Sequence, residues 1–268
     1  MFRKYLLAIC AALALSLAGA HAGDAVAISQ HDGLTWADVT VGGRVLHFVV
    51  DTGATSSCIN LAAARRIGIP LGNPVTIAGV GGETTGYRCG NFQASAGGMR
   101  LPAEVLALDL SGPARACSQP IDGLIGADFF RGKVVRLDFA RGLLMAVAQP
   151  VDGGMPLRFL NGVMCAPVAL NGGSRQWTRL DTGCSDTVVW CGPTRPGGKD
   201  ARKSVALAWP GAHRTKADVA VGGRDLGSLA VTLRPKQIFP GEAGLLGNAA
   251  LSKYRVTIDA VHGRLALE

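Results

Sequence analysis

The hydrophobic pattern near the start of the chain predicts a β-hairpin that ends at an aspartate. Residues 36–41 alternate apolar and polar side chains, Gly42-Gly43 follows, and residues 44–50 form a second strand-like run. Alternation with a period of two is typical of strands with one buried face, and paired glycines favour tight turns. The second run leads directly into Asp51.

The same arrangement occurs again in the second half of the chain. Residues 164–170 and 175–180 are two more strand-like runs, separated by the turn sequence Asn-Gly-Gly at 171–173, and Asp181 follows them. The many glycines and few aromatic residues also favour short strands and turns over long helices. We expect one short helix, at residues 61–67, because Asn60 can cap its start and Gly68 can end it.

Two pairs of short motifs show that the repetition covers most of the chain. Asp-Thr-Gly begins at Asp51 and again at Asp181, an offset of 130 residues. Gly-Leu-Ile-Gly at 123–126 and Gly-Leu-Leu-Gly at 244–247 begin gap-free matches at an offset of 121 residues. One Asp-Thr-Gly is a weak signal, but two copies at strand ends with a second motif pair are a strong one. A repeat of about 110 residues is too long for a solenoid and indicates duplication of a half-domain.

Two carboxyl groups that equivalent backbone segments hold close together have a defined chemistry. They cannot both ionise near neutral pH, so they share one proton and one acts as acid while the other acts as base. A water molecule between them can then be deprotonated while the carbonyl group that it attacks is protonated. Glycine after each threonine allows a sharp turn and a close approach of the two loops.

These motifs resemble those of the aspartic proteases, in both the two-lobed pepsin-like form and the viral retropepsin form. The resemblance implies an all-β, bilobal acid-protease fold with pseudo-twofold symmetry, in which two β-barrel-like lobes enclose a peptide cleft under a flap hairpin. It implies no metal and no cofactor. It assigns catalysis to Asp51 and Asp181, and support of the active-site loops to Thr52, Gly53, Thr182 and Gly183.

The flap is expected at residues 75–89, about 30 residues after Asp51, where the family carries it. The residues expected to contact substrate there are Gly79, Val80, Gly81, Gly82 and Tyr87. Tyr87 is offset from the position of the pepsin flap tyrosine, so a packing role is an equal alternative. A phosphate-binding glycine loop is disfavoured because no Lys-Ser or Lys-Thr follows the glycines.

Residues 1–22 have the features of a secretory signal peptide. Arg3 and Lys4 precede an apolar run at 6–17, and Ala-His-Ala at 20–22 is a small-residue cleavage site. We therefore expect a periplasmic or secreted protein with no stable membrane insertion after cleavage. The expected organisation is an N-terminal lobe at 24–148, a linker at 149–156 and a C-terminal lobe at 157–268.

Charge and cysteine content add further expectations. The net charge of +8 comes without long basic runs, so a solvated surface is favoured over nucleic-acid binding. Six cysteines follow the signal segment, and in an oxidising compartment they favour disulfides; Cys89 with Cys117 and Cys184 with Cys191 are the local candidates. Cys184 is disfavoured as a nucleophile because no histidine accompanies it in a motif.

The expected function is that of a monomeric aspartic endopeptidase acting on peptide or protein substrates, since one chain supplies both aspartates. The alternatives are a non-catalytic peptide-binding module and an envelope assembly protein on the same scaffold. In pepsin-like enzymes a hydroxyl residue usually stands three positions after each aspartate, whereas here Ala54 and Cys184 do. The loss of these donors predicts a mildly acidic optimum of roughly pH 5–6, unless Thr55 or Ser185 replaces them.

Overall fold

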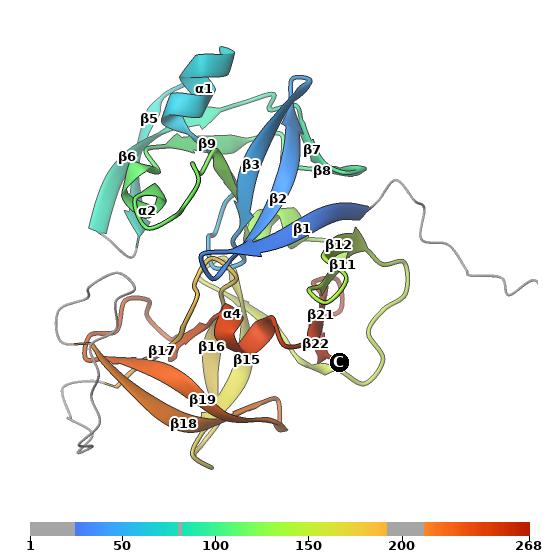
Figure 1. Ribbon diagram of the computed structural model, residues 1–268, viewed down its shortest axis with the longest axis vertical. Coiled ribbons are helices and arrows are strands. Elements are labelled where there is room, and N and C mark those ends of the chain that lie inside the picture. Colours follow the sequence, from blue (N-terminus) through green and yellow to red (C-terminus); the bar gives the residue numbers. More distant parts are fainter. Residues whose placement is uncertain (1–24, 80–81, 192–211) are drawn as a thin grey trace, which may run out of the picture.

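The computed structural model describes residues 25–79, 82–191 and 212–268 (Figure 1). The predicted signal segment and the flap-tip residues Val80 and Gly81 lie outside these ranges. Strands dominate, which confirms the all-β prediction. The helices of the described part are short: α1 (Leu61–Ile67), α2 (Ser111–Ala114), α3 (Ala127–Phe130) and α4 (Asn248–Leu251).

The strands of the N-terminal half are hydrogen-bonded in one continuous order. In this order they are β1 (Ala25–His31), β2 (Leu34–Val41), β3 (Arg44–Val50), β10 (Gly123–Ile125), β4 (Cys58–Asn60), β9 (Val105–Leu108), β6 (Gly82–Cys89) and β5 (Pro74–Gly79). A small hairpin of β7 (Ala94–Ala96) and β8 (Met99–Arg100) pairs with β2. The β2–β3 hairpin turns at Gly42-Gly43, both with positive φ, as the sequence predicts.

The C-terminal half contains a closed β-barrel. Its strands follow the order β15 (Val163–Leu170), β16 (Gln176–Leu180), β20 (Gly244–Leu246), β17 (Thr187–Trp190), β19 (Arg224–Arg234) and β18 (His213–Val221). Pairing of β15 with β18 closes the ring, and β14 (Arg158–Leu160) pairs with β15 outside it. Closure leaves no exposed strand edge within the ring.

An antiparallel sheet joins the two halves. Its order is β13 (Met155–Pro156), β22 (Arg264–Leu267), β21 (Arg255–Asp259), β11 (Val134–Asp138), β12 (Leu143–Ala146) and β1. At its centre Arg136 lies opposite Thr257, its repeat equivalent 121 residues later, and donates to the threonine hydroxyl at 3.1 Å. Val135 lies opposite Ile258, which is the repeat equivalent of Leu137. The register is therefore symmetric about the Arg136–Thr257 pair.

The core is continuous between the halves. Its largest fully buried side chains come from both repeats and include Phe48, Phe129, Phe130, Leu144, Met164, Leu180 and Leu246. Burying each such side chain contributes about 1.5–3 kcal/mol. Val50 and Leu180, the residues that directly precede Asp51 and Asp181, belong to this core, so both strand ends are anchored in it.

Helix α1 forms where its capping residues predict it. The Asn60 side chain accepts a hydrogen bond from the Ala62 N–H at 3.1 Å, and Gly68 ends the helix in the left-handed conformation with φ of 76°. Ala63 and Ala64 are buried against the core, while Arg65 and Arg66 occupy the last turn. A basic last turn complements the helix dipole.

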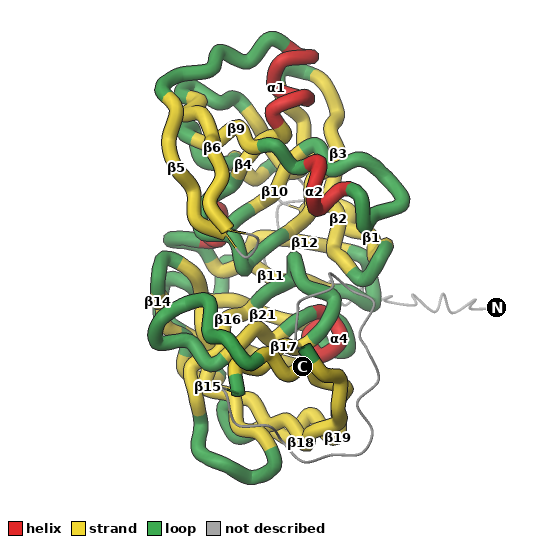
Figure 2. Tube along the Cα trace, turned by 90° about the vertical axis from the view of Figure 1, so that its left-hand side faces the viewer, coloured by secondary structure: helices red, strands yellow, loops and turns green. Residues whose placement is uncertain are grey.

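Strands β5 and β6 form the hairpin predicted at residues 75–89. They pair antiparallel from Pro74–Tyr87 to Gly79–Gly82. Figures 1 and 2 show its free end pointing from the N-terminal half toward the C-terminal half. The Tyr87 side chain packs against the core at the base of the hairpin, which favours the packing alternative for this residue.

The two predicted disulfides are wrong. Cys89 and Cys117 are free thiols that donate to different carbonyls, those of Tyr87 and Pro113. Cys184 is also a free thiol and donates to the Asp186 carbonyl at 3.2 Å. Each thiol is oriented by its own local backbone rather than toward another sulfur.

Among residues 25–79, 82–191 and 212–268, no helix has the length and apolar character needed to span a membrane.

Candidate active site

Each of the two predicted aspartates directly follows the last residue of a buried strand. Asp51 follows β3, and its N–H donates to the Ile125 carbonyl at 2.9 Å. Asp181 follows β16, and its N–H donates to the Leu246 carbonyl at 3.0 Å. Strands β10 and β20, which carry these carbonyls, run parallel to β3 and β16. Each repeated Gly-apolar-apolar-Gly motif therefore positions one aspartate.

The two threonines connect the aspartate loops by reciprocal hydrogen bonds. Each threonine N–H donates to the other's hydroxyl at 3.1 Å. The Thr52 hydroxyl then donates to the Leu180 carbonyl at 2.8 Å, and the Thr182 hydroxyl donates to the Val50 carbonyl at 2.5 Å. Both threonines are buried. Because the bonds cross between the halves, they fix the distance between the strands that carry the aspartates.

The glycines allow the carboxyl groups to meet. A Cβ atom built on Gly53 would lie 2.5 Å from both carboxyl oxygens of Asp181, and one built on Gly183 would lie 2.6 Å from Oδ2 of Asp51. Neither position has room for a side chain. The Asp51 and Asp181 carboxyl groups are close enough for each to affect the pKa of the other.

The surroundings of the two carboxyl groups differ. Oδ1 of Asp51 accepts hydrogen bonds from the N–H groups of Gly53 and Ala54, both at 3.0 Å. Oδ1 of Asp181 accepts one, from the Gly183 N–H at 3.1 Å. Hydrogen bonds from N–H groups favour a charged carboxylate. Asp51 is therefore better stabilised as the anion, and Asp181 is the better site for a shared proton.

The pKa values follow the same order. Burial raises the pKa of Asp51, and the N–H groups of Ala54 and Gly53 oppose that increase. Burial first and the Asp51 charge second raise the pKa of Asp181 well above its usual range, with Arg179 opposing. The two carboxyl groups therefore differ in how strongly they hold a proton, and a different role is available to each.

The Thr55 and Ser185 hydroxyl groups were the possible replacements for the donors missing at positions 54 and 184. Among the described residues, neither forms a hydrogen bond with an aspartate of the dyad. The Thr55 hydroxyl donates to the Asn161 carbonyl at 3.5 Å. Among the described residues, no hydrogen bond joins the Ser185 hydroxyl to Asp181. At Asp51 the backbone N–H of Ala54 supplies the donor instead.

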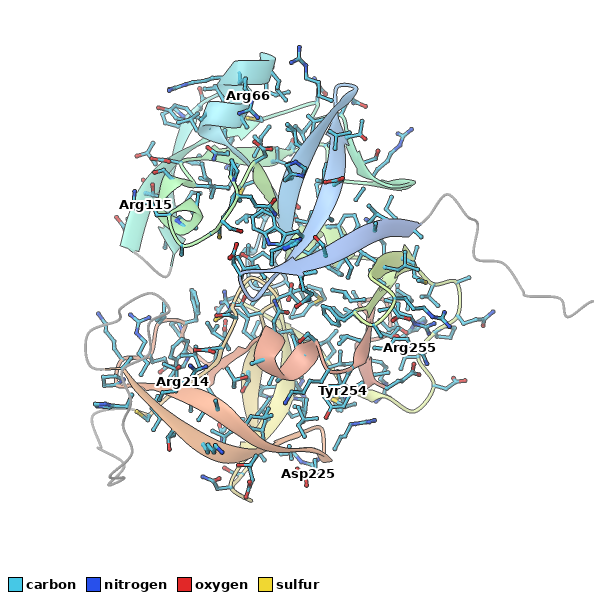
Figure 3. The ribbon with its side chains drawn as sticks, viewed as in Figure 1. Arg66, Arg115, Arg214, Asp225, Tyr254 and Arg255 are labelled. Carbon is cyan, nitrogen blue, oxygen red and sulfur yellow. The ribbon has the colours of Figure 1, made fainter. Side chains whose placement is uncertain are left out.

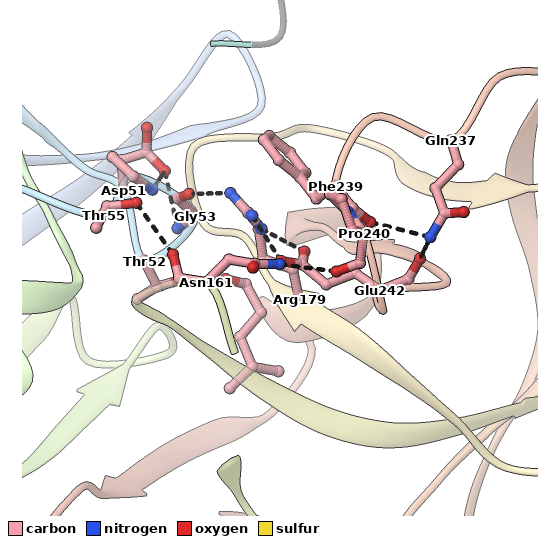
Figure 4. Close-up of polar contacts among 12 residues, drawn as sticks. Asp51, Thr52, Gly53, Thr55, Asn161, Arg179, Gln237, Phe239, Pro240 and Glu242 are labelled. Atoms are coloured by element: carbon pink, nitrogen blue, oxygen red, sulfur yellow. Dashed lines mark hydrogen bonds and ion pairs between the residues drawn. The ribbon is translucent and has the colours of Figure 1, made fainter. Parts of the chain in front are cut away.

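Sequence reasoning missed a buried ion pair beside the dyad. Arg179 and Glu242 are bonded through Nε to Oε2 at 2.7 Å and through a terminal nitrogen to Oε1 at 2.8 Å, and their side chains are 5% and 0% exposed. A second terminal nitrogen of Arg179 donates to the Gly53 carbonyl at 2.7 Å (Figure 4). An arginine one residue before the end of the strand that leads to Asp181 was the available signal, but its partner lies 63 residues later.

Other acidic residues singled out by the repeat have structural roles. Asp138 accepts a hydrogen bond from the Arg141 N–H at 3.0 Å, and Asp259 accepts from the Val261 and His262 N–H groups at 3.1 and 2.8 Å. Each aspartate therefore stabilises the turn that follows its strand. Within the described ranges, no cluster of three or more His, Cys, Asp or Glu side chains is arranged to hold a metal ion.

Comparison with known proteins agrees with this arrangement. Residues 37–129 match a family model described as aspartyl protease. The match includes Asp51 and ends before the second Asp-Thr-Gly. No curated protein matches the chain. The match supports an aspartyl protease family and, at the level of that family, a peptidase activity.

Proposed function

We propose that the protein is an aspartic endopeptidase in which Asp51 acts as the base and Asp181 as the acid. One observation carries the proposal: two Asp-Thr-Gly loops bring two carboxyl groups close enough to affect each other's pKa, and among the described residues Asp51 accepts two backbone N–H bonds where Asp181 accepts one. The dyad therefore holds one proton over a range of pH, which is the state that acid–base hydrolysis requires.

In the proposed reaction, Asp51 takes a proton from a water molecule as the water oxygen attacks the peptide carbonyl carbon. Asp181 gives its proton to the carbonyl oxygen, so the tetrahedral intermediate is neutral. Breakdown breaks the C–N bond, moves a proton to the leaving amine nitrogen and returns the carbonyl. No metal ion enters these steps.

The fold class proposed with this function is the bilobal, pseudo-twofold acid-protease fold. The symmetric register about Arg136 and Thr257 and the paired contacts of the two Asp-Thr-Gly loops support it. Because both carboxyl groups lie in one chain, we also propose that the monomer is the active species. The basic and apolar N-terminal sequence supports secretion to the periplasm or beyond.

The β5–β6 hairpin is the proposed flap. Its direction toward the C-terminal half supports a role in covering a bound peptide (Figure 2). Gly79 and Gly82 end the described strands of the hairpin, and they are the proposed contacts with the substrate backbone.

Incubation of the signal-free protein with denatured casein at pH 4–7 tests the proposal. We expect discrete peptides, identified by mass spectrometry, and slower cleavage in the presence of pepstatin. Cleavage that resists pepstatin but is lost in the Asp181→Asn variant also supports the enzyme. Saturable peptide binding with intact peptide after long incubation would instead support the binding or assembly alternatives.

A further inference from the structure

The buried arginine next to the dyad has contacts unlike those of the chain's other paired arginines. Among the described residues, the other arginines paired with a carboxylate are Arg66, Arg141, Arg214 and Arg255, and their side chains are 42–73% exposed. Figure 3 labels three of them, Arg66, Arg214 and Arg255, on outer parts of the fold. Such exposed pairs contribute little to stability. Arg179 is 5% exposed and lies directly behind the Asp51 loop.

One peptide group links Arg179 to Asp51. The guanidinium donates to the Gly53 carbonyl oxygen at 2.7 Å, and the N–H of the same peptide unit, that of Ala54, donates to Oδ1 of Asp51 at 3.0 Å. A cation on the oxygen polarises the peptide and strengthens its N–H as a donor. The positive charge thus reaches the carboxylate through two consecutive hydrogen bonds (Figure 4).

Within the described residues, a link of this kind from a charged group occurs in one half only. At the other aspartate the neutral Asn248 amide donates to the Thr182 carbonyl at 2.8 Å, and the N–H of that peptide unit, that of Gly183, donates to Oδ1 of Asp181 at 3.1 Å. The repeat equivalent of Arg179 is Val49, since Val49 pairs with Leu124 as Arg179 pairs with Leu245. Among the described residues, no side chain donates a hydrogen bond to the Gly183 carbonyl. The repeat is therefore symmetric in its backbone and asymmetric in its charge.

The surroundings hold the guanidinium in this geometry. Glu242 binds it with both carboxylate oxygens, and Asn161 Nδ2 donates to Glu242 Oε1 at 2.8 Å and to the Pro240 carbonyl at 2.9 Å. The Phe239 ring lies 3.5 Å from the guanidinium carbon. With these contacts in place, the guanidinium is held at the Gly53 carbonyl.

We propose that Arg179 is a positioning residue that keeps Asp51 the ionised member of the dyad, acting through the Gly53–Ala54 peptide group. This inference rests on the proposed function and identifies the residue that makes Asp51 the base and Asp181 the acid. It also explains how the Asp51 loop functions with alanine at position 54, where a hydroxyl donor would otherwise stabilise the anion.

The other titratable groups near the dyad do not supply this charge. Burial raises the pKa of the thiols of Cys58 and Cys184, so both are neutral. Asp128 accepts hydrogen bonds from Ser57, and Asp186 pairs with Arg214 at 2.8 Å. Arg179, paired with Glu242, is a cationic group of the described surroundings that lowers the pKa of both aspartates. Its direct charge does not distinguish them, and the hydrogen bonds through the Gly53–Ala54 peptide group direct its effect to Asp51.

Two variants with opposite expected effects test the proposal. Arg179→Met combined with Glu242→Met removes the pair without leaving a buried charge, a change that proteins often tolerate. Its dyad should lose its first proton at higher pH, by about one pH unit. Glu242→Gln removes the carboxylate that neutralises the Arg179 guanidinium, so the dyad should lose its first proton at lower pH. Arg255→Met, at an exposed ion pair, is the control and should leave this transition unchanged.

The transition is measured by carbon-13 NMR titration of labelled aspartate carboxyl groups, assigned with Asp51→Asn, and by the acid limb of kcat/KM against pH. Shifts in the two opposite directions support the proposal. An unmoved transition in whichever of the two variants is folded overturns it. The NMR titration does not depend on turnover, so a chain that cuts no peptide would refute the proposed function while leaving this test valid.

Discussion

Replacing Gly53 by alanine adds one methyl group at the point where the two aspartate loops meet. The new carbon would lie 2.5 Å from both carboxyl oxygens of Asp181, whereas real Cβ contacts are essentially never below 3.0 Å. The Asp181 carboxyl group or the loops must therefore move apart from the new carbon by at least about half an ångström, and by about 1 Å for an ordinary contact. A displacement of about 1 Å in a catalytic group can cost about 10²-fold in rate. The strain should lower stability by about 1–3 kcal/mol.

The assay is kcat/KM on a fluorogenic peptide together with the thermal midpoint of unfolding. Gly90→Ala is the matched control, because a Cβ there meets nothing within 4 Å and its φ is not positive. We expect a loss of about 100-fold or more in Gly53→Ala, a similar loss in Gly183→Ala, and wild-type behaviour in Gly90→Ala. If Gly53→Ala kept its activity and thermal midpoint, the reasoning on close apposition of the loops would be refuted.

Further predictions concern pH, stability and assembly. Ala54→Ser adds a hydroxyl donor to Asp51 and should move the acid limb of kcat/KM to lower pH; an unmoved limb in a folded, active variant would contradict this. The raised pKa of Asp181 means that the folded state binds more protons than the unfolded state above about pH 4. Stability should therefore fall as pH rises through the folded pKa, and thermal midpoints between pH 5 and 8 should fall less in Asp181→Asn. Thr182→Val leaves buried partners unsatisfied and should cost about 1–3 kcal/mol in denaturant unfolding, whereas Thr40→Val, on an exposed face, should be nearly neutral. Sedimentation should show a monomer with specific activity independent of concentration; activity that rises with dimer formation would contradict it.

The sequence predicted much of the local structure because short-range physics determines it. The hairpins that end at Asp51 and Asp181 follow from alternation and paired glycines, and the limits of α1 follow from Asn60 and Gly68. The repeated glycine motifs, which indicated the duplication, form the strands β10 and β20 beside the two aspartate strands.

Features that depend on contacts distant in sequence were not predicted. Arg179 and Glu242 meet only because β16 and the segment before β20 are adjacent in the barrel. The proposed disulfides failed because proximity in sequence does not determine thiol orientation, as the bond from Cys184 to the Asp186 carbonyl shows. The hydrogen bonds that distinguish the two aspartates come from backbone N–H groups. The two identical Asp-Thr-Gly sequences therefore could not reveal the difference.

The central claim is that Asp51 and Asp181 hydrolyse peptide bonds as one acid–base pair. The most direct test is kcat/KM, at the wild-type optimum, of the single variants Asp51→Asn and Asp181→Asn, with Asp38→Asn at an exposed position as control. The account predicts that both single variants fold and lose activity by at least about 10³-fold, while the control remains fully active. Near-wild-type activity in either single variant would contradict it.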